Sequence, residues 1–249
     1  MATGNDDQVV VVGTLSASFA YIGSGQQEVG DIASAFVRFA LEIGALQLLP
    51  QGRSLKSGRL SPYFFNSGIF STATTIDGLA DAYVHVIEAH YDGDVLPDVI
   101  FGPAYKGIQI ATMVAYLLSL GHSDYDPGIA FNRKEAKDHG EGGVLVGSSL
   151  AGKRVLIVDD VITDGASKRE AVDIIRAQGG TPIGCVIAFD RQERGVDEAD
   201  ARSAAQRFEQ DLGIPVYAVA TLANLISVLE EGQSEMLPKI LAYKDQYGV

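Results

Sequence analysis

Residues 154–167, with the sequence RVLIVDDVITDGAS, combine the residue types that a sugar and phosphate site needs. The apolar run at residues 155–158 is typical of a strand buried on both faces, and it ends in two adjacent carboxylates, Asp159 and Asp160. A turn with a hydroxyl and a glycine follows, and a helical segment begins near Ser167. Carboxylates accept hydrogen bonds from sugar hydroxyls, whereas turn N–H groups and a helix N-terminus bind phosphate. Because ligands of α/β proteins usually bind where strands end, this segment predicts a site for a phosphorylated sugar.

Two other interpretations of this segment are a core strand that ends in solvated acids and the Walker B strand of a nucleotide-binding protein. A Walker B strand needs a partner P-loop, and the nearest candidate is GSSLAGK at residues 147–153. Arg154 stands where a P-loop requires serine or threonine, and the candidate precedes a strand instead of opening a helix. The candidate therefore fails as a P-loop, and the sugar-phosphate interpretation is favoured.

Two further segments could place positive charge near such a ligand. FGPAYKGI at residues 101–108 predicts a strand, a Gly-Pro turn and a helix, which is another anion-binding arrangement, with Tyr105 and Lys106 beside the turn. RKEAKDHGEGG at residues 133–143 holds three cations and three carboxylates besides its histidine, so its formal charge is balanced. On composition alone, this second segment indicates a solvated loop.

A pair of aromatic residues and one arginine offer contacts for a flat, anionic substrate. Phe64 and Phe65 lie in the Gly/Ser-rich segment at residues 51–68, where they could cover a planar heterocycle or belong to the core. In FDRQERG, residues 189–195, Arg191 follows a strand and could bind a carboxylate through two parallel hydrogen bonds. The alternative is a surface salt bridge among the charged residues of that segment.

The spacing of apolar residues predicts strands that alternate with helices along the chain. We expect helices over residues 28–43, 77–90, 108–120, 167–178, 199–212 and 222–229. We expect strands over residues 46–49, 98–102, 128–132, 144–147, 154–158, 181–190 and 216–220. This alternation predicts an α/β fold with a mainly parallel sheet flanked by helices, in one domain with a smaller N-terminal part.

Composition and charge limit the class of protein. The chain has 249 residues and a net charge of −13, which argues against general binding to nucleic acid or to anionic membranes. Cys185 is the only cysteine, so an intrachain disulfide and a cysteine metal cluster are both excluded. No apolar run approaches the ~18 residues of a membrane span. The acidic start lacks the basic region of a signal peptide, so we expect a cytoplasmic protein. Residues 8–22 are apolar and β-prone, and they could form an edge strand, a pairing segment in an oligomer or a simple extension.

The residues VLIVDDVITDGAS resemble the phosphoribosyl-pyrophosphate (PRPP) signature of the type I phosphoribosyltransferases. Within that family, DDVIT followed by a glycine-containing turn is most similar to the orotate phosphoribosyltransferases. The resemblance extends to LKSGRLSPYFFNSG, FGPAYKGI, FNRKEAKDHGEGG and FDRQERG, which occur in the family's order. It implies the type I phosphoribosyltransferase fold in a domain of residues 28–249, with a small N-terminal hood at about residues 28–70. Residues 1–27 would then be an N-terminal extension of unknown role.

The resemblance also implies which residues meet each substrate. Residues of the signature, of the 101–108 turn and of the charged loop would bind PRPP: Tyr105, Lys106, Arg133, Lys134, Lys137, His139, Asp159, Asp160, Val161, Ile162, Thr163, Asp164, Gly165, Ala166 and Ser167. Residues of the hood, the phosphate turn and the last motif would bind orotate: Lys56, Phe64, Phe65, Thr163 and Arg191. The charged loop would supply the catalytic residues, because its cations would stabilise the departing pyrophosphate: Arg133, Lys134, Lys137 and His139.

The implied reaction transfers the phosphoribosyl group of PRPP to orotate and releases pyrophosphate, which makes the chain a glycosyltransferase of pyrimidine biosynthesis. Mg²⁺ is the implied cofactor, held by PRPP and water without direct protein ligands. The family also implies a homodimer in which the charged loop reaches the neighbouring subunit, with no nucleic-acid or membrane partner. One alternative is a purine phosphoribosyltransferase, which the hood and Arg191 disfavour. The other is a PRPP-sensing regulator on the same fold, which the acidic N-terminal segment disfavours because DNA binding needs a basic module.

Overall fold

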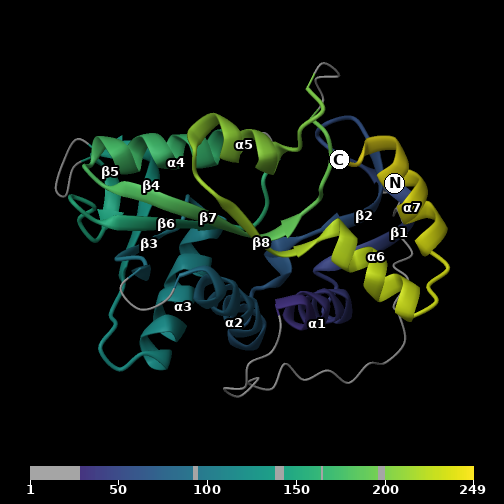
Figure 1. Ribbon diagram of the computed structural model, residues 1–249, viewed down its shortest axis with the longest axis horizontal. Helices are drawn as coiled ribbons and strands as arrows, with labels where there is room; N and C mark the ends of the chain where they lie inside the picture. Colours follow the sequence, from purple (N-terminus) through teal and green to yellow (C-terminus); the bar gives the residue numbers. More distant parts are fainter. Residues whose placement is uncertain (1–28, 92–94, 138–142, 164, 196–199) are drawn as a thin grey trace, which may run out of the picture.

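The computed structural model describes residues 29–91, 95–137, 143–163, 165–195 and 200–249 (Figure 1). Its first half contains α1 (Val29–Glu42), β1 (Leu46–Ser54), β2 (Leu60–Phe65), the 3₁₀ helix η1 (Ser67–Ile69), α2 (Ala73–His90), β3 (Val99–Phe101) and α3 (Lys106–Gly121). Its second half contains β4 (Gly128–Lys137), β5 (Gly143–Gly147), β6 (Arg154–Asp159), α4 (Ala166–Ala177), β7 (Thr181–Asp190), α5 (Ala204–Leu212), β8 (Val216–Thr221), α6 (Leu222–Glu231) and α7 (Leu237–Tyr247).

Six strands form the central sheet in the order β5-β4-β3-β6-β7-β8. Neighbouring strands from β4 to β8 are parallel, and within the described residues only β5 runs antiparallel, beside β4. Strands joined through helices in this way need a covering layer on each face of the sheet. The predicted α/β fold with a mainly parallel sheet is therefore confirmed.

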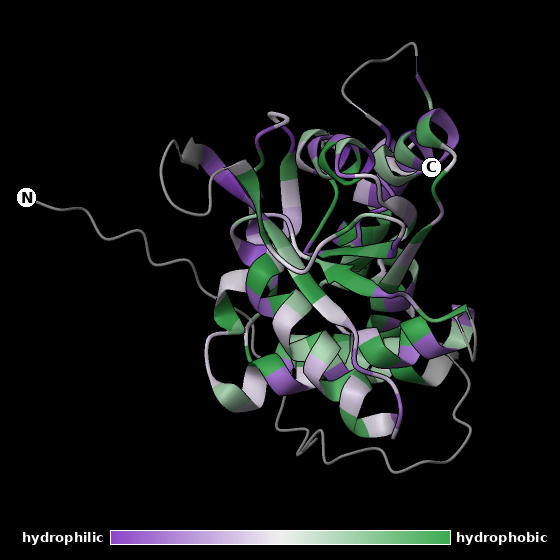
Figure 2. Cartoon of the chain, turned by 90° about the vertical axis from the view of Figure 1, so that its left-hand side faces the viewer, coloured by the Kyte–Doolittle hydropathy of each residue, from purple (hydrophilic) through white to green (hydrophobic). Residues whose placement is uncertain are grey.

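Helices cover both faces of this sheet: α1, α2 and α3 lie on one side, and α4 and α5 lie on the other (Figure 1). The alternation of side chains along β6 divides its residues between the two layers. Leu156 and Val158 pack into the cluster with α1, α2 and α3, whereas Val155 and Ile157 pack into the cluster with α4 and α5. The strands at the centre of the sheet are accordingly hydrophobic along their length (Figure 2). This explains why β6 appears in the sequence as an unbroken apolar run.

A separate antiparallel pair, β1 and β2, lies at one end of the molecule beside α6 and α7 (Figure 1). No strand was predicted within the Gly/Ser-rich segment at residues 51–68, but β1 extends to Ser54 and the whole of β2 lies there. The pairing register shifts between Leu48 and Arg53, which marks a bulge, and Gly58 adopts a left-handed φ of 80° in the connecting turn. Bulges and turns break the alternation by which strands are predicted.

Three other elements differ from expectation. β4 continues to Lys137, where we expected a loop from residue 133, because β5 pairs with it as far as Gly143. α5 begins at Ala204 instead of residue 199, behind a capping box at Ser203. α7 was not predicted at all. No helix in the described ranges combines the length and the apolar character that a membrane crossing requires.

Candidate active site

Most of the site residues predicted from the sequence lie where parallel strands end. Asp159 is the last residue of β6, Asp190 is the last residue of β7, and Gly102 follows the end of β3. These three strands are neighbours or next neighbours in the sheet. The sheet therefore brings together the segments around residues 102–106, 159–167 and 190–195.

Asp160 is the meeting point of three segments that are distant in sequence. Its Oδ2 accepts hydrogen bonds from Ser67 Oγ at 2.5 Å and from Lys106 Nζ at 3.0 Å, and its Oδ1 accepts from the Val161 N–H at 2.8 Å. Burial by itself raises the pKa of Asp160, but the hydrogen bonds from Ser67 and Lys106 outweigh it and hold the pKa below its ordinary value. Asp160 is thus an ionised acceptor at the site. Ser67 was missed in the sequence, where it is one serine in a Gly/Ser-rich segment.

Asp159 lies in different surroundings, because its side chain is buried and both of its oxygens have protein partners. Oδ2 lies 2.5 Å from Lys168 Nζ, and Oδ1 accepts from the Asp160 N–H at 3.0 Å. Lys168 is itself buried and also donates to the Val161 carbonyl at 2.6 Å. Burial raises the pKa of Asp159, and Lys168 offsets part of this rise. Lys168, which was not among the predicted site residues, therefore joins the first turn of α4 to the end of β6.

The segment after this pair, which was predicted to bind phosphate, precedes α4. Ile162 is buried, Thr163 is exposed, and Gly165 adopts a left-handed φ of 77° as the N-cap of the helix. Gly165 has no side chain, so no side-chain cap hydrogen bond forms at the N-terminus of α4. Ala166 is exposed and Ser167 is half-buried, whereas Asp164 lies outside the described residues.

The turn between β3 and α3 holds Tyr105 and Lys106 beside Asp160. Tyr105 is 74% exposed, and Lys106 bridges Asp160 and the Ser67 hydroxyl, which accepts its ammonium at 2.7 Å. The buried Asn132 of β4 fixes this turn, since its Oδ1 accepts the Ala104 N–H at 2.9 Å. The Gly-Pro pair predicts this turn from the sequence, but no feature of the sequence around Asn132 indicates that this residue supports it.

The charged loop is described only in part. Arg133 is half-buried and Lys134 is exposed, both on β4. The backbone of Lys137 ends that strand, but its side chain and the whole of His139 lie outside the described residues. The predicted catalytic roles of these cations therefore remain predictions.

The two adjacent aromatic residues of β2 point to opposite sides. Phe65 is 7% exposed and stacks on Phe189, with ring centroids 5.6 Å apart, so it belongs to the core instead of lying open to a substrate. Phe64 is half-buried, and the Arg53 guanidinium lies 4.1 Å from its ring centroid. The expectation that both rings cover a heterocycle does not hold for Phe65, because successive strand residues face opposite ways. Lys56 is exposed in the turn between β1 and β2.

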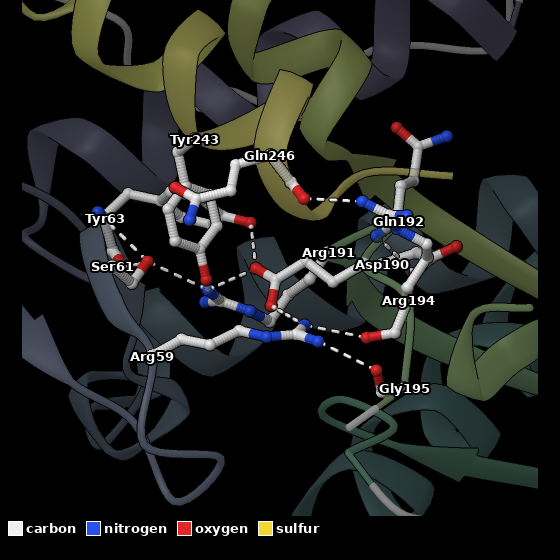
Figure 3. A network of polar contacts seen from close by, with 11 residues as sticks. Arg59, Ser61, Tyr63, Asp190, Arg191, Gln192, Arg194, Gly195, Tyr243 and Gln246 are labelled. Carbon is white, nitrogen blue, oxygen red and sulfur yellow. Dashed lines mark hydrogen bonds and ion pairs between the residues drawn. The ribbon is translucent and has the colours of Figure 1, made fainter. Parts of the chain in front are cut away.

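Arg191 lies in a polar network that joins β2, the segment after β7 and α7 (Figure 3). Its Nη2 donates to Glu193 Oε1 at 2.6 Å and to Ser61 Oγ at 2.9 Å, and its guanidinium lies 4.3 Å from the Tyr63 ring centroid. Burial by itself lowers the pKa of Arg191, but Tyr63 and Glu193 outweigh it and raise the pKa, so the group stays charged. The alternative was a surface salt bridge among Asp190, Glu193 and Arg194. Glu193 instead pairs with Arg191, and both of these side chains are largely buried.

Comparison with known proteins places this chain in one family. The phosphoribosyl transferase domain model matches residues 74–215. The orotate phosphoribosyltransferase of Stenotrophomonas maltophilia is 50% identical over 218 residues, which cover 86% of this chain and 95% of the relative. That of Bordetella avium is 48% identical over 223 residues, covering 87% and 98%. The crystal structure of the Francisella tularensis orotate phosphoribosyltransferase superposes with a TM-score of 0.74 at 36% identity, covering 86% of this chain and 99% of that one.

A more distant structure shares the fold alone. The orotate phosphoribosyltransferase of Mycobacterium tuberculosis, solved in complex with PRPP, superposes with a TM-score of 0.53 at 21% identity, covering 79% of this chain and 98% of that one. The near relatives, in contrast, are 50% and 48% identical to this chain over almost their whole length. The chain thus belongs to the orotate phosphoribosyltransferases, the glycosyltransferases of pyrimidine biosynthesis that join orotate to the phosphoribosyl group of PRPP.

Proposed function

We propose that Asp160, Ser67 and Lys106 form the point at which PRPP is anchored for this reaction. The observation that carries this role is the contact of all three side chains at the end of β6. The ionised Asp160 is suited to accept hydrogen bonds from a ribose hydroxyl, and the half-exposed Lys106 is suited to neutralise pyrophosphate beside it. Asp159 supports Asp160, because its Oδ1 accepts the Asp160 N–H while Lys168 holds its Oδ2.

The 5′-phosphate of PRPP would bind at the turn of residues 161–167. Support comes from Gly165, whose left-handed conformation and missing side chain leave the N-terminus of α4 open to an anion. The hydroxyls of Thr163 and Ser167 lie on the same turn and could donate to phosphate oxygens.

Orotate would bind between the hood and the segment after β7. A buried, permanently charged Arg191 suits the orotate carboxylate, which a neutral pyrimidine or a purine lacks. Phe64, Lys56 and Thr163 would complete this side, whereas Phe65 would act only from behind, through its packing in the core.

The chemistry is dissociative, because the bond from ribose to pyrophosphate breaks as positive charge develops on the sugar carbon. Lys106 and the loop cations would stabilise the negative charge that moves onto pyrophosphate: Arg133, Lys134, Lys137 and His139. No covalent nucleophile is needed, since the residues position the two substrates and exclude water.

Mg²⁺ would enter with PRPP instead of being held by a protein cluster. The carboxylates at the site fit this arrangement, because Asp159 is occupied by Lys168, and Asp160 by Ser67 and Lys106. The described residues contain no group of three or more His, Cys, Asp or Glu side chains suited to a metal ion. When bound, Mg²⁺ supplies further neutralisation of the pyrophosphate charge.

The test is the release of pyrophosphate from PRPP, measured with orotate, adenine and hypoxanthine in turn. Of the three bases, we expect only orotate to give turnover. We expect Asp160→Asn to raise the KM for PRPP about tenfold or more, because a charged acceptor is lost. Turnover of a purine without turnover of orotate would overturn the proposal. An unchanged KM for PRPP in Asp160→Asn would remove the anchoring role alone.

A further inference from the structure

Glu193 lies at the centre of the polar network around Arg191. Its side chain is only 10% exposed. Oε1 accepts hydrogen bonds from Arg191 Nη2 at 2.6 Å and from the Tyr63 hydroxyl at 3.1 Å, and Oε2 lies 3.5 Å from Arg59 Nη1. One carboxylate therefore holds a guanidinium from the segment after β7 and another from the turn before β2.

The ion pairs of this network leave one positive charge over. Arg59 and Arg191 both contact the single carboxylate of Glu193. Tyr63 adds no negative charge, because burial raises the pKa of its hydroxyl well above the ordinary value. Buried charge that is only partly neutralised by the protein is suited to an anionic ligand.

The orientation of Arg191 depends on more than this ion pair. The same Nη2 also donates to Ser61 Oγ at 2.9 Å and to the Tyr243 hydroxyl of α7 at 3.4 Å (Figure 3). Arg59 in turn donates to the carbonyls of Arg194 at 2.7 Å and Gly195 at 2.8 Å (Figure 3). The acceptors of Arg191, Ser61 and Tyr243, lie on β2 and α7, so the position of its guanidinium is set by segments that lie far apart in the sequence.

We propose that Glu193 is a positioning residue for orotate, which holds the Arg191 guanidinium in the plane and place where it meets the substrate carboxylate. This inference rests on the proposed contact between Arg191 and orotate. Glu193 acts through Arg191 and does not touch the substrate. Through the hydrogen bond between Arg191 and Tyr243, α7 also contributes to substrate recognition. This helix lies outside residues 74–215, which the domain model matches.

Glu193→Gln tests this role, because glutamine keeps the shape and one acceptor oxygen but loses the charge. We expect the KM for orotate to rise about tenfold, since a charge-assisted hydrogen bond to the guanidinium is weakened, with a smaller change in kcat. The KM for PRPP should stay within about twofold, because the PRPP residues lie at the end of another strand. Glu235→Gln, at an exposed position after α6, is the matched control and should leave both KM values unchanged.

A double-mutant cycle with Arg191→Ala separates positioning from a general structural effect. If Glu193 acts through Arg191, Glu193→Gln should raise the KM for orotate in the wild-type chain but not further in the Arg191→Ala background. The same rise in both backgrounds would overturn the inference and indicate a structural role. If Arg191→Ala raises this KM and Glu193→Gln does not, the inference fails while the proposed orotate contact stands. If Arg191→Ala itself changes nothing, the proposed contact fails and the inference with it.

Discussion

Asp159 and Asp160 are adjacent in the sequence, yet their carboxylates lie in different environments. The first is buried against Lys168, and the second faces Ser67 and Lys106. Burial raises the pKa of Asp159 more than Lys168 lowers it, whereas the hydrogen bonds around Asp160 hold its pKa below the ordinary value. The pair is thus divided between Asp159, which holds the turn, and Asp160, which we propose to bind PRPP.

Lys168→Met should destabilise the fold by about 3–5 kcal/mol at pH 8, because it leaves the Asp159 carboxylate buried without its cation. The free energy of unfolding, measured by urea denaturation, checks this value. Asp159→Asn in the same chain should restore much of the loss, since the buried charge is then removed. Lys153→Met, at an exposed position, is the control and should change stability by less than about 0.5 kcal/mol.

The loss in Lys168→Met should depend on pH in a defined direction. Without Lys168, the pKa of Asp159 in the folded chain rises further above its value in the unfolded chain, about 3.9. The folded state then binds more protons than the unfolded state, so stability falls as pH rises from about 4 to the raised folded value. The deficit relative to wild type should therefore be full at pH 8 and smaller at pH 5. A deficit that is constant across this range would contradict the role assigned to the ion pair.

Lys137→Ala should lower kcat by about 10²-fold while leaving the fold intact, because the lysine charge matters mainly as pyrophosphate departs. Lys137 is the last residue of β4, and a substitution at the end of a strand should leave the melting temperature within a few degrees of wild type. Steady-state kinetics and thermal unfolding check the two parts. A kcat near the wild-type value would refute the assigned role.

At the scale of elements, β3 and α3 approach each other closely in the turn that holds Tyr105 and Lys106. A Cβ atom at Gly102 would lie 2.0 Å from the Gly107 carbonyl oxygen and 2.3 Å from its carbon. Backbone atoms at that distance have no rotamer by which to move away, so only glycine allows this approach.

Gly102→Ala should therefore lower the free energy of unfolding by about 1–3 kcal/mol or more and raise the KM for PRPP, because Tyr105 and Lys106 shift with the turn. Gly121→Ala, at the other end of α3, is the matched control. The nearest atom to its added Cβ is Glu88 Oε1 at 3.8 Å, and stability should be unchanged or slightly higher. Equal effects of the two substitutions would show that the close approach is not the cause.

Elements with a strong local pattern could be predicted from the sequence, and those defined by tertiary pairing could not. The apolar run of β6 and the Gly-Gly end of α4 were located to within a residue or two. β2 contains a proline and no clear alternation, and it is a strand because β1 pairs with it. The same reason applies to the supporting side chains: Ser67 is 93 residues from Asp160, and Tyr63 is 130 residues from Glu193. Single polar residues carry no local signal of partners so far away.

At the scale of the whole molecule, the proposed homodimer with shared active sites can be tested by mixing two defective variants. If the charged loop acts in the partner's site, a dimer of one Lys137→Ala chain and one Asp160→Asn chain has one site with both defects and one intact site. Random exchange makes half of the dimers mixed, so about a quarter of the wild-type activity should return. Light scattering confirms the dimer mass. No recovery in a confirmed mixed dimer would mean that each chain builds its own site.

The two apolar layers on either side of β6 and β7 have a consequence for the order in which the molecule opens. Strands enclosed on both faces should be the slowest to exchange their amide hydrogens with deuterated solvent, whereas the separate β1 and β2 pair should exchange sooner through local opening. Asp159 and Asp160, which we propose to hold PRPP, lie at the end of the enclosed strand β6. Arg191, in contrast, is held partly by Ser61 of β2. In mild denaturant we therefore expect PRPP to remain bound after the chain has lost its selectivity for orotate. PRPP would then be hydrolysed by water instead of transferring its phosphoribosyl group.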